Sequence, residues 1–266
     1  MRIYRFAALF LLTFAIGVII PFYGGPAAAQ TAEFDNTNDP IEPFNRAVFE
    51  FNRYADALLI KPLALLYRDF VPPPLRTGVH NALANLRTPI TLANDLMQGE
   101  MTRAGVTVQR FAINSTIGIG GLFDFATDFG IEGHREDFGQ TLAIWGSGEG
   151  FYLVLPLFGP SSGRDGIGLA VDTFLDPLIY FAPTNALAAR TLIRGVDERE
   201  GVIDTLDEIE RTSLDFYATL RSLYRQHRGD EIRNGAPAPV LPIPSISIDD
   251  FEDIEDVDGE TAALIN

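Results

Sequence analysis

A glycine-rich, apolar stretch between Asn114 and Asp165 constrains the fold of this chain more than any other segment. It contains eleven of the 24 glycines, set between bulky apolar runs. Between Phe138 and Gly163 the only ionic side chain is that of Glu149. Each interior glycine costs a helix about 1 kcal/mol relative to alanine, so the stretch is not one helix, and it is too apolar for an ordinary surface loop. We expect either the buried centre of a globular domain or backbone that bends inside a lipid-facing structure.

The first 29 residues have the organisation of an export signal. Arg2 and Arg5 form a basic start, residues 6–20 are apolar, and the small-residue sequence that ends at Ala29 is typical of a cleavage site. The apolar run is too short to span a bilayer comfortably. We therefore expect a cleaved signal peptide over residues 1–29, a mature chain that begins at Gln30, and export to the periplasm or the envelope.

The sequence contains no cysteine. This excludes disulfides, thiolate metal sites, cysteine nucleophiles and acylation at an N-terminal cysteine. Without Arg2 and Arg5, 18 basic residues remain against 36 acidic ones. That balance argues against nucleic acid as a partner, and against adsorption to anionic lipid through a basic surface. Residues 234–266 are rich in proline and in acidic side chains and are predicted to be a disordered tail, which leaves one folded domain at residues 30–233.

Most of that domain shows apolar residues at helical spacing. A first helix is predicted to begin at Asp39, as its capping residue, with Glu42 completing a capping box. Pro62 is expected to interrupt or kink this helix, and prolines at 72–74 to end the segment. The apolar face of the first helix consists of Phe44, Val48, Phe51, Ala55 and Leu58, and the opposite face carries Asn45, Arg46, Asn52, Arg53 and Asp56.

Further helices are predicted at residues 75–88, 90–98, 101–115, 136–145 and 164–174, with a break at Pro89. Residues 151–157 are the one convincing strand. A single long helix is predicted from Thr184 or Asn185 to about Gly229, because apolar residues alternate at spacings of four and three from Val202 to Leu223. The predicted fold class is therefore mainly α, with amphipathic helices broken by proline and by Gly-rich irregular segments.

Two glycine motifs suggest chemistry but lack the necessary context. The sequence from Gly118 to Gly121 has no preceding βαβ pattern, and position 123 is Phe rather than glycine. A nucleotide-binding loop is therefore rejected in favour of a hinge or a tight backbone approach. Residues 159–163 match G-x-S-x-G, the nucleophile elbow of serine hydrolases. That alternative function would use Ser161 as nucleophile and Asp172 or Asp176 as the acid. The only later histidine is His227, near the end of the predicted C-terminal helix.

The three histidines, His80, His134 and His227, lie in no H-E-x-x-H or other carboxylate–histidine sequence motif. The aspartates around the glycine-rich stretch are expected to pair with arginines or to cap helices: Asp124, Asp128 and Asp137. We therefore expect no catalytic residue, no metal site and no cofactor.

A series of ordered motifs identifies a family resemblance. The motifs are Asp39-Pro40-Ile41-Glu42-Pro43-Phe44-Asn45-Arg46, Tyr67-Arg68-Asp69-Phe70-Val71-Pro72, Asn85-Leu86-Arg87-Thr88-Pro89, Asn94-Asp95-Leu96-Met97-Gln98-Gly99, Asn114-Ser115-Thr116-Ile117-Gly118-Ile119-Gly120-Gly121-Leu122-Phe123-Asp124, Glu136-Asp137-Phe138-Gly139-Gln140-Thr141-Leu142 and Tyr152-Leu153-Val154-Leu155-Pro156-Leu157-Phe158-Gly159-Pro160. Over residues 39–225 the chain resembles the VacJ/MlaA family of Gram-negative outer-membrane lipid-transport proteins.

The resemblance implies a ring of amphipathic helices that is embedded in one leaflet of the outer membrane and surrounds a polar channel. It implies removal of mislocalised phospholipids from the outer leaflet, transfer to a periplasmic carrier, and association with a trimeric porin. It implies no hydrolysis by the ring itself. Family members are usually lipidated at a cysteine that this chain lacks, so its hold on the membrane is expected to come from apolar helix faces, from the porin, or from both.

Glycine-rich segments are the expected gate of such a channel, because non-helical backbone is tolerated at membrane depth where it lines a wet cavity. The gate candidates are Gly118, Gly120, Gly121, Gly146, Gly148 and Gly150, with Phe44 and Asn45 as further candidates at the start of the ring. A soluble periplasmic binding protein is the third functional alternative.

Overall fold

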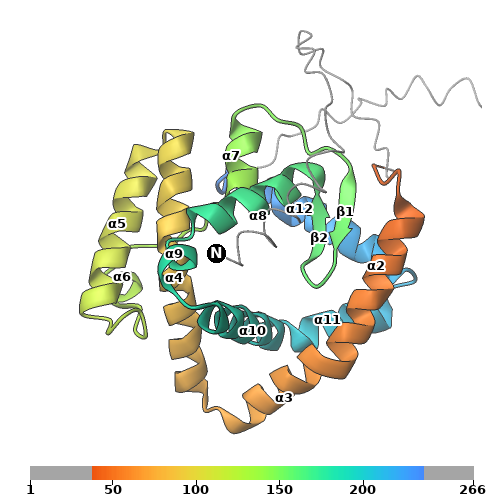
Figure 1. Ribbon diagram of the computed structural model, residues 1–266, viewed down its shortest axis with the longest axis horizontal. Coiled ribbons are helices and arrows are strands. Elements are labelled where there is room, and N and C mark those ends of the chain that lie inside the picture. The colour runs from red at the N-terminus through yellow and green to blue at the C-terminus, as the bar shows by residue number, and fades with distance from the viewer. Residues whose placement is uncertain (1–37, 237–266) are drawn as a thin grey trace, which may run out of the picture. The chain divides into compact units, whose positions relative to one another are not determined.

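The structure, a computed structural model, describes residues 38–236, which are mainly helical (Figure 1). The predicted signal peptide and residues 237–266 of the predicted tail lie outside the described residues. The helices are α2 (Glu42–Ala55), the π-helical turn η1 (Asp56–Ile60), α3 (Lys61–Phe70), α4 (Pro73–Gln98), α5 (Met101–Thr116), α6 (Phe125–Asp128), α7 (Phe138–Ile144), α8 (Gly163–Leu175), α9 (Leu178–Phe181), α10 (Thr184–Gly201), α11 (Ile203–Thr212) and α12 (Phe216–Ile232). The strands are β1 (Tyr152–Leu155) and β2 (Gly159–Ser162).

The described elements contact one another in a closed circuit. α2 continues through η1 into α3, α3 packs on α10, and α10 packs on α4. α4 in turn contacts α8, α8 contacts the β-hairpin, and β1 contacts α2 (Figure 1). α5 and α7 pack against α4, and α12 reaches α7 and β2. Residues 38–236 thus form the expected ring of helices, which the antiparallel pair β1–β2 closes. Among these residues, no helix has both the length and the apolar character needed to cross a membrane.

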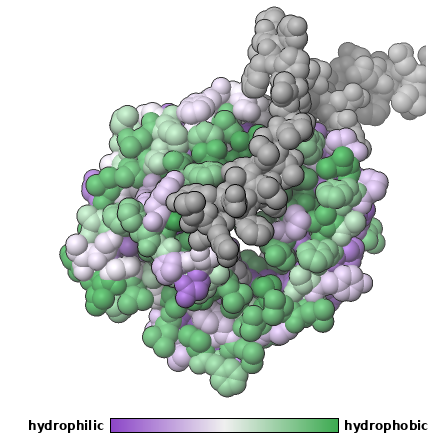
Figure 2. All heavy atoms as spheres, in the orientation of Figure 1, coloured by the Kyte–Doolittle hydropathy of each residue, from purple (hydrophilic) through white to green (hydrophobic). Residues whose placement is uncertain are grey.

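Many polar side chains are buried and many apolar side chains are exposed, which is the opposite of the distribution usual in a soluble domain. In the described part of the chain, buried polar side chains outnumber buried apolar ones. Many large apolar side chains are exposed, including Phe181 at 85%, Leu58 at 80% and Phe70 at 79%. Figure 2 shows apolar residues over much of the face in view. Exposure of this much apolar surface to water is unfavourable. Such a surface therefore indicates contact with lipid or with another protein.

The first ring helix shows how the sequence produces this distribution. On α2, Phe44 and Phe51 of the predicted apolar stripe are exposed. Asn45 and Asn52, on the opposite face, point to the hairpin. The Asn45 side chain donates to Tyr152 O at 3.0 Å and accepts from Val154 N at 2.9 Å. The prediction is confirmed for Phe44, Phe51, Asn45 and Asn52. Val48 of the predicted stripe instead packs on the buried cluster around Phe49, and Arg53 of the predicted polar face is exposed.

Ion pairs join the polar side of η1 and α3 to α10 and α11. Arg199 donates two hydrogen bonds to Asp56, at 2.9 and 3.0 Å, and Lys61 lies 2.8 Å from Asp207. The kink expected at Pro62 is the π-helical turn just before it, where Lys61 N donates to Asp56 O five residues earlier. This turn bends the chain without ending the helix.

Two predicted helix boundaries are wrong. α4 continues through Pro89 instead of breaking there. Proline removes only one backbone hydrogen bond, and the helix is packed on both sides of this point, since Asn85, Ile90 and Thr91 are buried. The predicted long C-terminal helix is three helices, because the backbone leaves helical geometry at Val202 and again at residues 213–215. Asp215 caps α12 by accepting from Ala218 N at 3.1 Å.

Two local predictions also need correction. Asp39 does not cap α2: its side chain accepts from Asn45 at 2.7 Å, from Arg221 at 2.9 Å and from the Tyr217 hydroxyl, so it joins the two ends of the folded chain. The predicted strand at residues 151–157 ends at Leu155 and turns back into β2, which was not predicted.

Candidate functional site

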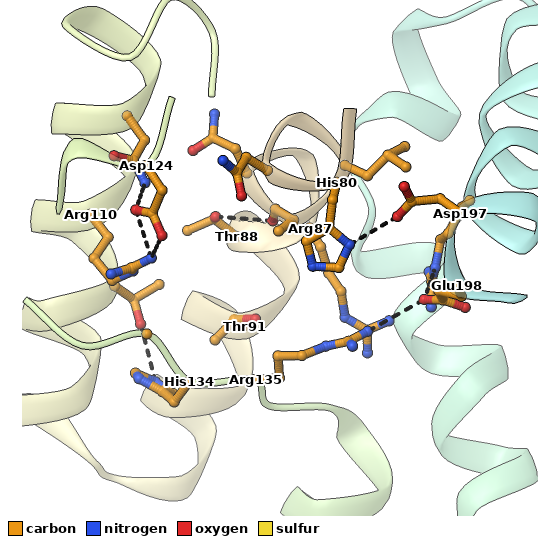
Figure 3. A pocket seen from close by; sticks show the side chains of 18 residues that line it. His80, Arg87, Thr88, Thr91, Arg110, Asp124, His134, Arg135, Asp197 and Glu198 are labelled. Carbon is orange, nitrogen blue, oxygen red and sulfur yellow. Dashed lines mark hydrogen bonds and ion pairs between the residues drawn. The ribbon is translucent and has the colours of Figure 1, made fainter. Parts of the chain in front are cut away.

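A polar cavity of about 240 Å³ lies where α4, α5 and α10 meet the segment between α5 and α7 (Figure 3). Its charged lining consists of His80, Arg87, Arg110, Asp124, His134, Arg135, Arg194, Asp197 and Glu198. Four arginines and three carboxylates therefore meet in one cavity, although the chain as a whole carries a formal charge of −16. The local charge opposes that of the protein, which favours an anionic ligand.

On the α5 side of the cavity, Arg110 holds Asp124 at 2.9 and 2.8 Å. Asn114 donates to the same carboxylate at 2.7 Å, and Asp124 caps α6 through Thr127 N. Burial raises the pKa of Asp124, but the hydrogen bonds from Thr127, Asn114 and Arg110 outweigh burial, so the pKa lies below its usual value. The expected pairing and capping roles of Asp124 are confirmed.

On the α10 side, Asp197 is buried and accepts from His80 Nδ1 at 2.9 Å and from the Tyr67 hydroxyl at 3.2 Å. Burial and the neighbouring Asp197 charge raise the pKa of Tyr67 to about 12. The Tyr67 hydroxyl therefore stays protonated at neutral pH and acts as a hydrogen-bond donor.

Three further guanidinium groups belong to the same cavity. Arg194 donates to Glu198 at 2.9 Å, and Arg135 lies 3.8 Å from the same carboxylate (Figure 3). The Nε atom of Arg87 is buried and has no hydrogen-bond partner among the described residues. Burial and the charges of Arg135 and Arg194 lower the pKa of Arg87.

At the cavity wall, the structure brings His134 to two carboxylates, which no sequence motif indicated. His134 Nε2 lies 2.9 Å from Asp95 Oδ1, and Glu136 is close enough that the three groups could surround a cation. Every carboxylate oxygen already has a protein partner: Thr107 at 2.6 Å on Asp95, and Gln98 at 3.0 Å and Arg103 on Glu136. Burial raises the pKa of Glu136 in spite of these partners. The arrangement is a hydrogen-bond network whose acceptors are already engaged.

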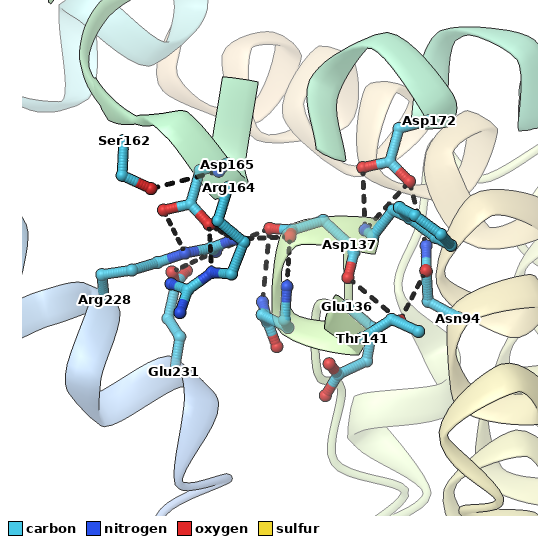
Figure 4. A network of polar contacts seen from close by, with 12 residues as sticks. Asn94, Glu136, Asp137, Thr141, Ser162, Arg164, Asp165, Asp172, Arg228 and Glu231 are labelled. Carbon is cyan, nitrogen blue, oxygen red and sulfur yellow. Dashed lines mark hydrogen bonds and ion pairs between the residues drawn. The ribbon is translucent and has the colours of Figure 1, made fainter. Parts of the chain in front are cut away.

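A second buried network joins α12 to the starts of α7 and α8 (Figure 4). Arg228 binds Asp137 at 2.6 and 2.7 Å and Asp165 at 2.9 and 3.0 Å. Burial would raise the pKa of both carboxyl groups, but the Arg228 hydrogen bonds and charge lower both. Asp137 also caps α7, as predicted, through Gln140 N at 3.0 Å. Asp128 forms neither a hydrogen bond through its side chain nor an ion pair within residues 38–236.

The first gate candidates lie against the cavity wall. Gly118 has no room for a side chain, because an added Cβ would lie 2.5 Å from Asn114 O and still closer to Phe123 O. An added Cβ on Gly121 would lie 2.8 Å from Asn85 Cγ. Both Asn85 and Asn114 line the cavity, so this segment is packed onto the cavity itself. Gly120 has φ +69° and open space around its Cβ position.

The other gate candidates lie elsewhere. Gly146 and Gly150 take positive φ at the two ends of the connection from α7 to β1, and Gly148 lies between them with open space. Phe44 is 57% exposed on the outer face of α2, whereas Asn45 is buried against β1. None of these five residues lines the cavity. Their roles as gate residues stay predictions.

Comparison with known proteins decides the family. The model of the MlaA lipoprotein family matches residues 37–231. The chain belongs to the MlaA family. A protein of Rickettsia bellii is 36% identical over 191 residues, which cover 71% of this chain and 75% of that protein. The intermembrane phospholipid transport system lipoprotein MlaA of Escherichia coli K12 is 33% identical over 240 residues, 88% of this chain and 93% of that protein.

A solved structure shows the same fold. It is described as the structural basis for maintenance of bacterial outer membrane lipid asymmetry, and it superposes with a TM-score of 0.65 at 32% identity. The match covers 73% of this chain and 98% of that one. The mainly helical architecture described above is therefore that of an MlaA-family protein.

In this MlaA-family chain, the hydrolase motif is a structural element. Ser161 is buried in β2, and its hydroxyl approaches only Ser162 O, at 3.4 Å. Asp172 accepts from Asn94 at 3.0 Å, Asp176 pairs with Arg190, and His227 lies 3.7 Å from Glu231. Within residues 38–236, no hydrogen bond joins any two of the four residues Ser161, Asp172, Asp176 and His227. Ser162 rather than Ser161 caps α8, accepting from Asp165 N at 3.1 Å.

The cavity arginines were missed as site residues, although the sequence carried a signal for them. His80 and Arg87 are seven residues apart on α4, as Arg103 and Arg110 are on α5, and this spacing places each pair on one helix face. The signal does not say that the two faces meet. Arg135 and Arg194 lie on distant segments, and only the fold brings them to Arg87.

Proposed function

We propose that this chain works in the outer membrane, where it removes phospholipids that have reached the outer leaflet and passes them to a periplasmic carrier, so that lipid asymmetry is maintained. The Escherichia coli relative is named as part of an intermembrane phospholipid transport system. The matching structure is described in terms of outer membrane lipid asymmetry. The chain shares the family and the fold of these proteins.

The observation that carries this proposal is the combination of many exposed apolar side chains with a charged, polar cavity between α4, α5 and α10. Side chains such as Phe44, Phe51 and Leu58 are exposed on the outside of α2 and η1. Exposed to water, each would cost about 1.5–3 kcal/mol relative to burial. Contact with lipid tails removes that cost, and the polar cavity can hold a polar group that does not dissolve among lipid tails. A phospholipid has both parts, so its headgroup suits the cavity and its tails suit the outer surface.

We propose two protein partners. A soluble periplasmic carrier is needed because each CH₂ group of an acyl chain exposed to water costs about 0.8 kcal/mol, so free transfer between membranes is very slow. A trimeric porin is proposed from the family resemblance, and the apolar surface of the ring offers a place for it. Neither role requires a catalytic residue of this chain.

We propose that apolar faces, the porin, or both hold the ring in the inner leaflet. The family and the Escherichia coli relative are both described as lipoproteins, whereas this sequence has no cysteine to acylate. Amphipathic helices bind membranes in proportion to their buried apolar area. The acidic balance of the chain gives no support to a polybasic mode.

Deletion of the gene in its own bacterium tests the transport function. Phospholipid exposed at the cell surface is expected to rise and to return to normal when the gene is restored on a plasmid. Unchanged surface phospholipid would contradict the proposal. Labelling of the purified chain at Ser161 by a fluorophosphonate would favour the hydrolase instead. Release of the wild-type protein by osmotic shock would favour the soluble binding protein.

Membrane attachment is tested separately by fractionation in a strain that lacks porins. The triple variant Phe44→Gln, Phe51→Gln, Leu58→Gln is expected to leave the membrane fraction more readily than the wild type. Its matched control replaces three exposed polar residues of the same region, Glu50→Gln, Arg53→Gln and Asp69→Asn. Equal retention of both variants and of the wild type would show that these apolar faces do not hold the chain.

A further inference from the structure

The cavity contains a positive group that the fold leaves uncompensated. Within residues 38–236, Arg87 takes part in no ion pair, and its buried Nε has no hydrogen-bond partner. Burial of a charge without a partner is costly, and proteins generally avoid it. A fold that retains such a group at a cavity wall has a guanidinium available to a ligand.

The neighbouring charges do not neutralise Arg87. The carboxylates that act on it most are Asp137 and Asp172, and both are engaged elsewhere. Asp137 is bound by Arg228 at 2.6 and 2.7 Å, and Asp172 accepts from Asn94 at 3.0 Å and from Phe138 N at 3.1 Å. Neither carboxylate lines the cavity.

Inside the cavity, each carboxylate already has a close basic partner. Asp124 is held by Arg110, Asp197 by His80, and Glu198 by Arg194. Arg135 reaches Glu198 only at 3.8 Å. Arg87 and Arg135 are therefore the two guanidiniums that lack a close partner of their own, and both line the cavity.

We propose that this cavity binds a phosphate-class anion, and that Arg87, with Arg135 beside it, recognises the phosphodiester of a lipid headgroup. The inference rests on the proposed function, which brings phospholipid to this ring. Guanidinium groups match phosphate geometry with paired N–H donors, and within residues 38–236 no hydrogen bond or ion pair engages the guanidinium of Arg87, which lines the cavity. A cavity of about 240 Å³ is far larger than the roughly 30 Å³ that one water occupies in the liquid, so it has room for such a group.

Arg87→Met tests the site, because methionine keeps much of the apolar stem and removes the charge. The full chain in a neutral detergent is titrated calorimetrically with glycerophosphoglycerol, a soluble headgroup analogue, with inorganic phosphate, and with glycerol as the ligand without phosphate. We expect the variant to bind glycerophosphoglycerol about ten- to a hundredfold more weakly than the wild type, the effect of losing one charge-assisted contact. Arg87→Lys, which keeps the charge without the fork, is expected to fall between the two.

Arg211→Met is the matched control. It also removes one arginine charge, but Arg211 lies on α11, its side chain is 71% exposed, and it lines no part of the cavity. Its affinity for glycerophosphoglycerol is expected to equal that of the wild type. A similar loss of affinity in both variants would show that only the overall charge of the protein matters, and would overturn the site.

Thermal unfolding separates binding from folding. Without ligand, Arg87→Met is expected to unfold at the same temperature as the wild type or a higher one, because it removes a buried charge that has no partner. A clearly lower unfolding temperature would assign Arg87 a structural role and count against the proposal.

The remaining outcomes distinguish a lipid headgroup from free phosphate, and the headgroup site from the transport function. Arg87-dependent binding of inorganic phosphate but not of glycerophosphoglycerol assigns the site to free phosphate and overturns the headgroup assignment. Absence of Arg87-dependent binding of either overturns the site. In cells, Arg87→Met at normal protein level is expected to increase surface phospholipid. If only the deletion strain shows that increase, the transport function stands and the headgroup site fails.

Discussion

Both terminal nitrogens of Arg228 bind the carboxylate of Asp137, at 2.7 and 2.6 Å, across 91 residues of sequence. The pair joins the C-terminal helix α12 to the start of α7, and Asp165 at the start of α8 accepts from the same guanidinium. Gly139 leaves the room for this contact, since an added Cβ there would lie 2.5 Å from Arg228 Nη2. The three helices are therefore joined through one buried cation.

Arg228→Met is expected to lower the free energy of unfolding by about 3–5 kcal/mol, because it leaves Asp137 buried without a counter-ion and Asp165 with Arg164 alone. Thermal or denaturant unfolding of the full chain in detergent measures the loss. Arg211→Met, on the exposed face of α11, is the control and is expected to change stability by less than about 0.5 kcal/mol. A loss of similar size in both variants would contradict the role of Arg228.

Stability is expected to depend on pH in two directions. The folded-state pKa values of Asp137 and Asp165 lie below the ordinary value of 3.8, so their contribution is fully present above about pH 3.8 and is lost as the pH falls below it. Burial raises the pKa of Asp172 above 3.8, so its ionised form destabilises the fold at neutral pH, and protonation relieves this as the pH falls towards 3.8.

Unfolding temperatures measured from pH 7 down to pH 3 are therefore expected to rise slightly and then to fall steeply. Asp172→Asn should reduce the rise and keep the fall, because asparagine retains an oxygen that can accept from Phe138 N. The rest of the rise is assigned to Glu136, whose pKa burial also raises. An unchanged rise in this variant would show that another group produces it.

Much of this architecture follows from local sequence. Phe44, Phe51 and Leu58 on one side of a helix and Asn45 and Asn52 on the other indicated two faces of opposite character, and the structure has both. Local spacing cannot say which face points inward, because apolar residues in a soluble protein would be buried. The family resemblance supplied that direction.

The errors arose where distant contacts or backbone details decide the outcome. α4 passes through Pro89 because neighbouring helices pack around it, which a local proline rule does not include. The stripe across Val202 and Ser213 keeps its period although the backbone breaks there, since side-chain period does not report backbone geometry. The cavity combines Arg87, Arg135 and Arg194 from three segments, and the local sequence of any one segment does not predict that they come together.

Substitution of Asn45 is expected to lower stability much more than substitution of Phe44. Asn45→Ala leaves the buried Val154 N–H without its acceptor, so the free energy of unfolding should fall by about 1–3 kcal/mol. Phe44→Ala removes an exposed side chain, so unfolding in detergent should change little. Denaturant unfolding of both variants under one condition measures the difference. Equal losses would contradict the assignment of the two faces.

Ser161 and Ser162 offer a second neighbouring pair. Ser162→Ala removes the α8 cap at Asp165 N and is expected to cost about 1 kcal/mol of stability. Ser161→Ala removes only a long hydroxyl contact to Ser162 O and is expected to leave stability and surface phospholipid unchanged. Excess surface phospholipid at normal protein level in Ser161→Ala would instead restore the hydrolase alternative.

The loop after α5 combines features expected of a gate. Ile119, a β-branched residue, has φ +52°, a conformation that such residues rarely adopt. Gly120 follows at φ +69°. Strained backbone of this kind often occurs at functional sites. Because Gly118 and Gly121 pack on Asn114 and Asn85 of the cavity wall, movement of the loop would change the cavity.

Gly118 and Gly120 should therefore differ. Gly118→Ala is expected to prevent folding, because its Cβ meets backbone on two sides, and the protein should not accumulate. Gly120→Val meets no neighbour and adds only backbone strain, about 1–2 kcal/mol, which is less than the stability of most domains. The protein should accumulate in the outer membrane, but the loop equilibrium should shift by about one order of magnitude.

Gly120→Asn is the control that separates strain from bulk, because asparagine tolerates positive φ far better than valine. We expect normal protein level in both Gly120 variants, excess surface phospholipid in Gly120→Val, and near-normal surface phospholipid in Gly120→Asn. Normal lipid asymmetry in Gly120→Val would show that this backbone does not gate transport. Equal excess in both variants would show that the loop tip needs open space rather than positive φ, and would reject a gate based on backbone conformation.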